Sequence, residues 1–154
     1  MHLAITENPK ETQKIAGELA SRLAGLKSRS ARQKNKALVV ALSGELGSGK
    51  TTFVSGFSKA LGVNEKVLSP TFVLIHKHKL KQNRYRFLYH IDAYRLESEK
   101  DLLELGIKEI LANPENIVMI EWADRVKKII PKNAVWIRLE HSSKRTRKIN
   151  INNL

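Results

Sequence analysis

The feature that most constrains this chain is a short glycine-rich segment, residues 44–51, with the sequence GELGSGKT. It matches the phosphate-binding loop pattern G-x-x-x-x-G-K-[ST] at every fixed position. In such a loop, backbone N–H groups bind phosphate oxygens, and glycine lets the main chain approach the ligand closely. The motif predicts that Lys50 reaches the β- and γ-phosphates of a nucleotide and that the Thr51 hydroxyl binds Mg²⁺.

The sequence on either side of this segment agrees with the motif. Residues 37–42 form a continuous apolar run, as expected for a strand buried on both faces. After the segment, apolar residues recur at helical spacing up to Gly62, which is a typical helix stop. A strand, a glycine loop and a helix in this order favour a phosphate-binding loop over a chance match on a glycine-rich turn. We therefore expect a nucleotide to contact the whole loop and the residue after it: Gly44, Glu45, Leu46, Gly47, Ser48, Gly49, Lys50, Thr51 and Thr52.

The composition predicts one globular domain over residues 1–154. Hydrophobic residues make up 42% of the chain and charged residues 28%, both ordinary for a soluble protein. Cysteine is absent, which excludes disulfides and cysteine-ligated metals and fits a cytoplasmic protein. No apolar stretch reaches transmembrane length and no signal peptide is recognisable, so we expect no membrane association.

The chain is strongly basic, with 28 Lys and Arg against 15 Asp and Glu and a net charge of +13. Such a balance indicates either anionic partners, such as nucleic acid or acidic proteins, or a solvated basic surface. The excess lies in three segments, residues 27–36, 76–86 and 144–148. None of them interleaves aromatic residues in a known nucleic-acid-binding pattern, so both interpretations stay open.

The remaining pattern alternates helices and strands. Asn8 with Glu11, and Ser98 with Asp101, predict two helix starts, and the second helix contains Gly106. Residues 72–75 and 85–91 predict an antiparallel hairpin, 117–120 a buried strand, and 134–139 with 147–151 two strands that pair at an edge of the sheet. The fold class predicted is α/β: a phosphate-loop, three-layer sandwich with a mixed sheet, parallel at the loop and antiparallel outside it.

A phosphate loop needs a carboxylate nearby to hold Mg²⁺. Asp92 and Glu121 each follow a predicted strand, and the strand before Glu121 has the cleaner buried pattern. We therefore expect Glu121 to be the metal-side carboxylate. Asp92 would orient or deprotonate the attacking water, or contact the metal through water. The alternative for each is a surface carboxylate at a strand end.

Other candidates stay open on the residues alone. Thr71 follows Ser69 in a turn and would either sense a γ-phosphate or simply begin a strand. Trp122 is by default a core residue, and otherwise a neighbour of the nucleotide or of a partner. The histidines at positions 76, 78 and 90 do not have zinc-binding spacing.

In chain order, the motifs resemble those of the bacterial TsaE (YjeE) family, ATPases of tRNA threonylcarbamoyladenosine biosynthesis. The matching pieces are GELGSGKTTF at residues 44–53, SPTF at 69–72, HIDAYR at 90–95, GI at 106–107 and EW at 121–122. The resemblance runs from about Asn8 to Trp122. The loop alone would be unspecific, whereas the whole set is specific.

The resemblance implies a small α/β nucleotide-binding protein that slowly hydrolyses ATP to ADP with Mg²⁺. It implies work in the cytoplasm with TsaB and TsaD, which together install threonylcarbamoyl on the adenosine next to the anticodon of ANN-reading tRNAs. Roles implied by position are phosphate binding by Lys50, Mg²⁺ binding by Thr51 and Glu121, and a requirement of activity for Asp92. The resemblance also implies a switch-like loop with Ser69 and Thr71, and a place near the nucleotide for Thr12.

The chain departs from the family in places, and two other functions are compatible with the sequence. Glu45 stands where the family often has Asp, the basic segment 27–36 is long, and the C-terminal part matches only in general character. A small-molecule kinase would need an arginine-rich lid. The candidate, residues 144–148, is expected among strands, so no arginine is expected near the loop. A nucleotide-gated module could instead bind RNA through its basic segments, and direct tRNA contact stays open.

Overall fold

The computed structural model describes residues 2–25, 35–64, 74–81 and 84–154. These residues form one seven-stranded sheet in the order β1-β7-β6-β2-β5-β4-β3. The four strands β6, β2, β5 and β4 run parallel to one another, while β3, β7 and β1 pair in antiparallel fashion. The predicted mixed sheet is therefore confirmed. The strands are β1 (His2–Thr6), β2 (Leu38–Ser43), β3 (Ile75–Lys79), β4 (Phe87–Asp92), β5 (Asn116–Glu121), β6 (Val135–His141) and β7 (Arg147–Asn152).

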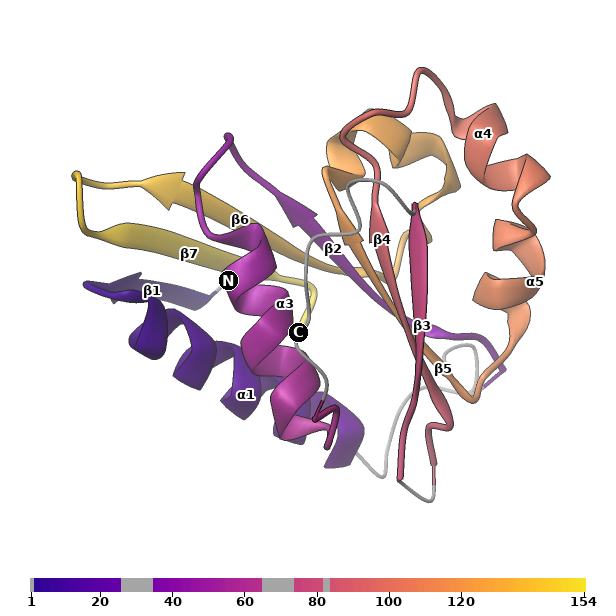
Figure 1. The fold of residues 1–154 in the computed structure, drawn as a ribbon, viewed down its shortest axis with the longest axis horizontal. Coiled ribbons are helices and arrows are strands. Elements are labelled where there is room, and N and C mark those ends of the chain that lie inside the picture. The colour runs from indigo at the N-terminus through magenta and orange to yellow at the C-terminus, as the bar shows by residue number, and fades with distance from the viewer. Residues whose placement is uncertain (1, 26–34, 65–73, 82–83) are drawn as a thin grey trace.

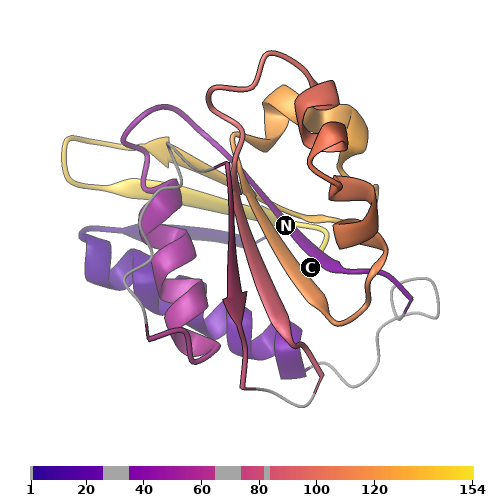
Figure 2. The same ribbon diagram turned by 45° about the vertical axis from the view of Figure 1, so that its right-hand side comes forward.

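Helices cover both faces of the sheet. The helices α1 (Pro9–Gly25) and α3 (Lys50–Ala60) lie side by side on one face, and the other face carries α4 (Glu99–Glu104), α5 (Ile107–Ala112) and the 3₁₀ helix η1 (Ala123–Ile129) (Figures 1 and 2). Side chains along β2 alternate between the two apolar cores: Val40 packs with the core under α1 and α3, and Val39 with the opposite core. This is the predicted three-layer sandwich.

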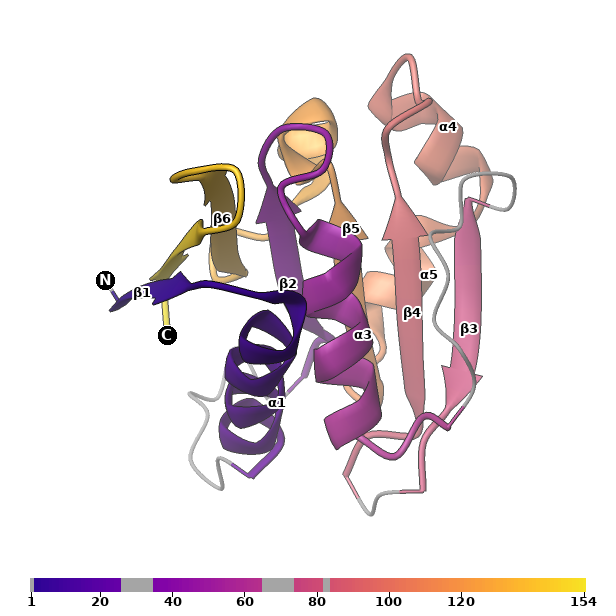
Figure 3. The same ribbon diagram turned by 60° about the vertical axis from the view of Figure 1, so that its left-hand side comes forward.

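Two small residues let α1 and α3 approach closely. A Cβ on Gly56 of α3 would overlap the backbone of Gln13 in α1, and one on Gly17 of α1 would lie 3.4 Å from the Cβ of Ala60. The start of α1 is held by Asn8, whose Oδ1 accepts the Glu11 backbone N–H at 3.0 Å. Because α3 begins at the end of the glycine loop, this crossing places the start of α1 beside that loop (Figure 3).

Several predicted elements need correction. The helix starting after Ser98 has the predicted capping box with Asp101, but it does not continue through Gly106. Gly106 has a φ of 78°, a left-handed conformation that separates α4 from α5. The predicted C-terminal strands do pair, but not at the edge, because β6 lies against β2 and the unpredicted β1 covers β7. Residues 72–73 of the predicted hairpin, and 27–34 of the basic segment, lie outside the described residues.

The arrangement that matters for function is at the carboxyl ends of the parallel strands. These ends meet at one edge of the sheet, where the glycine loop follows β2, and such edges are where open α/β sheets bind ligands. Asp92 ends β4, Glu121 ends β5, and the two residues are direct register partners. Among the described residues, no helix is long and apolar enough to cross a membrane.

Candidate nucleotide-binding site

The glycine loop adopts the strained backbone that its sequence predicts. Gly44, Gly47 and Gly49 have φ values of 137°, 74° and 101°, which side-chain-bearing residues rarely adopt. At Gly44 the space is also restricted, because a Cβ there would overlap the carbonyl oxygen of Leu139 in β6. The loop thus packs tightly against the neighbouring parallel strand, and its conformation depends on glycine at these positions.

Lys50 directs its ammonium group back over the loop. Its Nζ donates hydrogen bonds to the carbonyl oxygens of Gly44 and Glu45, both at 2.8 Å, and lies 3.4 Å from the buried Ser48 hydroxyl. Burial lowers the pKa of Lys50, while the nearby carboxylates of Glu121, Asp92 and Asp124 oppose that lowering. The loop therefore holds one positive charge at its mouth.

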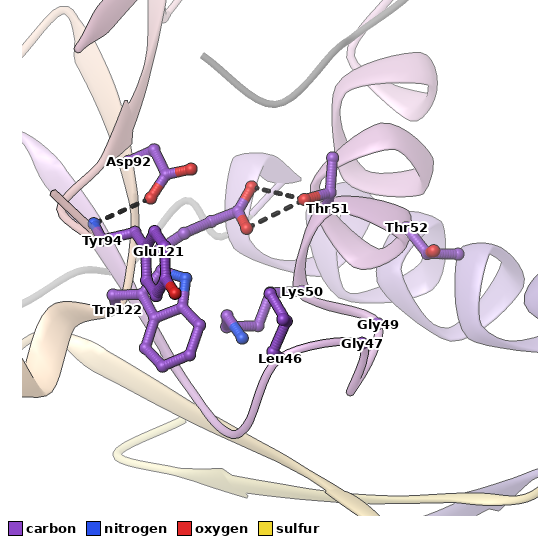
Figure 4. A pocket seen from close by; sticks show the side chains of 10 residues that line it. All are labelled: Leu46, Gly47, Gly49, Lys50, Thr51, Thr52, Asp92, Tyr94, Glu121 and Trp122. Carbon is purple, nitrogen blue, oxygen red and sulfur yellow. Dashed lines mark hydrogen bonds between the residues drawn. The ribbon is translucent and has the colours of Figure 1, made fainter. Parts of the chain in front are cut away.

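Two buried carboxylates face this charge. The Thr51 hydroxyl donates to both Glu121 oxygens, at 2.9 and 3.1 Å, and Asp92 accepts the Tyr94 backbone N–H at 2.9 Å (Figure 4). Glu121 is 2% exposed and Asp92 6%. A cavity of about 300 Å³ brings most of the predicted residues together. It is lined by Leu46, Gly47, Gly49, Lys50, Thr51, Thr52, Asp92, Tyr94, Glu121 and Trp122.

This donor set fits Mg²⁺. A hydroxyl and carboxylates are the hard oxygen ligands that Mg²⁺ prefers, and in nucleotide sites the phosphates and water complete the coordination. No group of three or more His, Cys, Asp and Glu side chains suited to a metal occurs in the described part of the chain. The fit therefore depends on Thr51 and Glu121, which already touch, with Asp92 beside them on the next strand.

His90 belongs to this site, although the sequence analysis considered it only for zinc. It is fully buried, and its Nε2 lies 2.7 Å from Oε1 of Glu121. Because the carboxylate can only accept, Nε2 carries the proton and donates it. His90 stands two residues before Asp92, so both side chains leave β4 on the same face. That period of two was the signal that could have identified it.

Trp122 lies at the cavity and also packs against the core under η1. Its φ and ψ of 56° and 38° are left-handed, which is uncommon for a residue other than glycine. The indole contacts Tyr94, with ring centres 4.8 Å apart, and the Lys50 ammonium lies 3.8 Å from its centre. The two interpretations of Trp122, core residue and neighbour of the site, therefore both apply.

A second cavity lies across the loop. It measures about 90 Å³ and is lined by Asn8, Pro9, Thr12, Gly47, Gly49, Thr52, Arg145 and Arg147. Arg147 donates from Nη2 to the Gly47 carbonyl at 3.3 Å. The expectation that no arginine lies near the loop is therefore wrong. Since β6 runs parallel to β2, its carboxyl end and the turn into β7 return to the same edge of the sheet.

The other predicted residues are placed less tightly or not at all. Gly44 and Glu45 line cavities on the β6 side of the loop, and Leu46 is 74% exposed. Ser69 and Thr71 lie outside the described residues, so their predicted switch role stays a prediction.

Fold and site together define an α/β protein with a phosphate-loop motif after a central parallel strand and an acidic side chain at the end of each of the next two strands. The chain belongs to the TsaE family. The family model described as threonylcarbamoyl adenosine biosynthesis protein TsaE matches residues 6–149. This match extends into β7, so the C-terminal part follows the family more closely than we expected. The family is involved in the biosynthesis of threonylcarbamoyladenosine in tRNA.

Individual relatives agree with this assignment. The TsaE protein of Bacillus subtilis is 33% identical over 144 residues, which cover 94% of this chain and 80% of that protein. That of Treponema pallidum is 36% identical over 73% of this chain and 80% of its own length. The crystal structure of YdiB from Bacillus subtilis is similar in fold, with a TM-score of 0.72, 27% identity and coverage of 97% of this chain and 83% of that one.

Proposed function

We propose that this chain is a Mg²⁺-dependent ATPase that serves threonylcarbamoyl modification of the adenosine next to the anticodon in ANN-reading tRNAs. In this proposal it works in the cytoplasm with TsaB and TsaD. The observation that carries it is the arrangement around Thr51, whose hydroxyl lies 2.9 Å from Glu121 in the cavity that Lys50 and Asp92 also line. A phosphate loop, one ammonium and two carboxylates are the groups that phosphoryl transfer from a nucleotide requires.

In the proposed ATPase, binding reorganises Lys50. Its ammonium now satisfies the loop's own carbonyls at Gly44 and Glu45, and it turns from them to the β- and γ-phosphates. Thr51 and Glu121 hold Mg²⁺, which when bound neutralises charge on the phosphate oxygens. The His90 imidazole keeps the Glu121 carboxylate in position through its 2.7 Å hydrogen bond.

Asp92 is the residue we assign to the attacking water. It is buried one strand away from Glu121 and level with it, so its carboxylate can accept a hydrogen bond from a water near the terminal phosphate. The chain's own residues thus supply positioning and electrostatic stabilisation rather than a covalent intermediate. Turnover of the isolated protein should be slow, and assembly with the partners should accelerate it.

Calorimetry with matched variants tests the proposal. Wild type should bind ATP in the presence of Mg²⁺, and Lys50→Ala should bind it far more weakly. Glu121→Gln should lose the Mg²⁺ dependence of binding. Asp92→Asn should bind ATP normally but hydrolyse it about 10²- to 10³-fold more slowly. A folded wild-type protein that shows no binding would overturn the proposal, as would turnover that is fast alone and unchanged by TsaB and TsaD.

One observation keeps a second function in view. Arg145 and Arg147 lie beside the loop, where a small-molecule kinase would carry the arginines of its lid. The two functions differ in their product, because the ATPase releases inorganic phosphate and a kinase phosphorylates an acceptor. A screen of acceptors with radiolabelled ATP separates them. Salt-dependent tRNA binding by the isolated chain would instead favour an RNA-binding module.

A further inference from the structure

The two cavities beside the phosphate loop are not independent. They share Gly47, Gly49 and Thr52, so an extended ligand that crosses the loop would occupy both. The first holds two carboxylates, an ammonium and the Thr51 hydroxyl, which suit a terminal phosphate and its metal ion. The second contains no carboxylate, and its polar groups are the Asn8 amide, the hydroxyls of Thr12 and Thr52, and two guanidinium groups.

We propose that the second cavity is the nucleoside subsite, which takes the ribose and base of the nucleotide against Arg147 and Arg145. The proposal rests on the ATPase function above and adds a direction to it. The terminal phosphate lies toward Glu121, and the base lies toward the turn between β6 and β7. Nothing in the loop motif itself gives that direction.

Chemistry and position both support the two arginines in this role. A guanidinium group is planar, stacks on aromatic rings and donates hydrogen bonds to ring nitrogens and sugar oxygens. Arg147 is half-buried and anchored, because it donates to the carbonyls of Gly47 at 3.3 Å and Thr146 at 3.1 Å. Arg145 is exposed at the rim, with its backbone N–H bonded to Ser143. The cavity is small, so the ribose fits inside and the base lies at the rim under Arg145.

The floor of the subsite is formed by α1. Thr12 is 2% exposed, and its hydroxyl is 2.8 Å from that of Thr6 in β1. The close crossing of α1 and α3 at Gly56 keeps this floor at a fixed distance from Thr52. The N-terminal strand and helix, which carry no part of the loop motif, thereby acquire a function in ligand recognition.

The test compares ATP with inorganic tripolyphosphate, which has the phosphates but no nucleoside. Calorimetry with Mg²⁺ present is run on wild type, Arg145→Ala, the double variant Arg145→Ala/Arg147→Ala, and Lys144→Ala as a control for loss of one exposed charge in the same turn. Wild type should bind ATP more tightly than tripolyphosphate. The double variant should lose roughly tenfold in ATP affinity, as expected for stacked bases, and should keep the tripolyphosphate affinity of Lys144→Ala within about twofold.

Each other outcome has one meaning. If wild type binds ATP and tripolyphosphate equally, or if the double variant binds ATP as well as Lys144→Ala does, the nucleoside subsite is wrong while the ATPase proposal stands. If tripolyphosphate affinity falls as much as ATP affinity, the arginines act on phosphates and the assignment is again wrong. If folded wild type binds neither ligand, the ATPase proposal itself fails. Arg145→Ala, which removes an exposed side chain, shows the effect without disturbing the Arg147 contact to the loop.

Discussion

The Nε2 atom of His90 lies 2.7 Å from Oε1 of Glu121, and both side chains are buried, at 0% and 3% exposed. The contact joins neighbouring parallel strands and fixes a carboxylate that also accepts from Thr51. Outer groups that orient a metal ligand commonly affect metal affinity as much as the ligand itself does. His90 is thus a positioning residue for the proposed Mg²⁺ site.

Replacing His90 should therefore weaken the Mg²⁺ site more than the nucleotide site. We expect His90→Leu to reduce Mg²⁺ affinity about tenfold or more, because Glu121 loses its orienting donor. Unfolding free energy should fall by about 1–3 kcal/mol, since a buried carboxylate loses a hydrogen bond. Mg²⁺ titration at fixed ATP measures the first effect and urea unfolding the second. His90→Gln, which keeps a donor, should restore part of both, and equal Mg²⁺ affinity in all three proteins would contradict the role.

The crossing of α1 and α3 should be intolerant of one methyl group. Gly56→Ala would place its Cβ against the Gln13 backbone, which cannot yield as a flexible side chain would. We expect a loss of about 1–3 kcal/mol in unfolding free energy, typical of overpacking. Gly25→Ala is the matched control, because a Cβ there meets nothing within 4 Å. Thermal melting of the two variants side by side checks this, and equal stability would show that the helices can separate without cost.

Trp122 should report the movement of Lys50. The ammonium group now lies 3.8 Å from the centre of the indole, and binding of phosphates should draw it away. The chain has two tryptophans, so Trp136→Phe leaves Trp122 as the single fluorophore. Its fluorescence should change on addition of ATP with Mg²⁺, and the change should be absent in the same protein carrying Lys50→Ala. A signal that survives loss of Lys50 would mean that another group moves.

Stability should fall at mildly acidic pH because of His76. Burial lowers the pKa of His76, and the neighbouring His90 and His78 lower it further. The folded state therefore disfavours the proton that the unfolded chain accepts near pH 6.5. The stability is fully present above about pH 6.5 and is lost as pH falls through the lower folded pKa. Urea unfolding between about pH 7.5 and pH 5 should show a smaller decline in His76→Gln than in wild type.

The sequence predicted the part of the site that local rules govern. The loop motif identified Lys50 and Thr51, and the rule that parallel strands end at one edge brought Asp92 and Glu121 to the same cavity. It did not predict His90 or Arg147, because their partners, Glu121 and Gly47, are 31 and 100 residues away in the chain. Such contacts depend on strand order, which hydrophobic pattern alone does not determine.

The same limit explains the errors in the fold. The strand β1 is short, and its outward residues Leu3 and Ile5 are 59% and 62% exposed, so its pattern does not resemble a buried strand. It becomes a strand because β7 offers an unpaired edge. The predicted long helix was broken by the backbone at Gly106, where a local preference for left-handed φ outweighed the helical spacing of apolar residues on either side.

The level pairing of Asp92 with Glu121 makes this site more sensitive to changes in chain length than to many changes of residue type. One residue inserted into β4 or β5 would turn the carboxylate after it to the opposite face of the sheet, toward α4 and α5, because side chains alternate with a period of two. Deleting two residues would preserve the face but draw the group back by about 7 Å, beyond reach of the loop. Indels in these two strands should therefore abolish the acidic pair even where the fold survives.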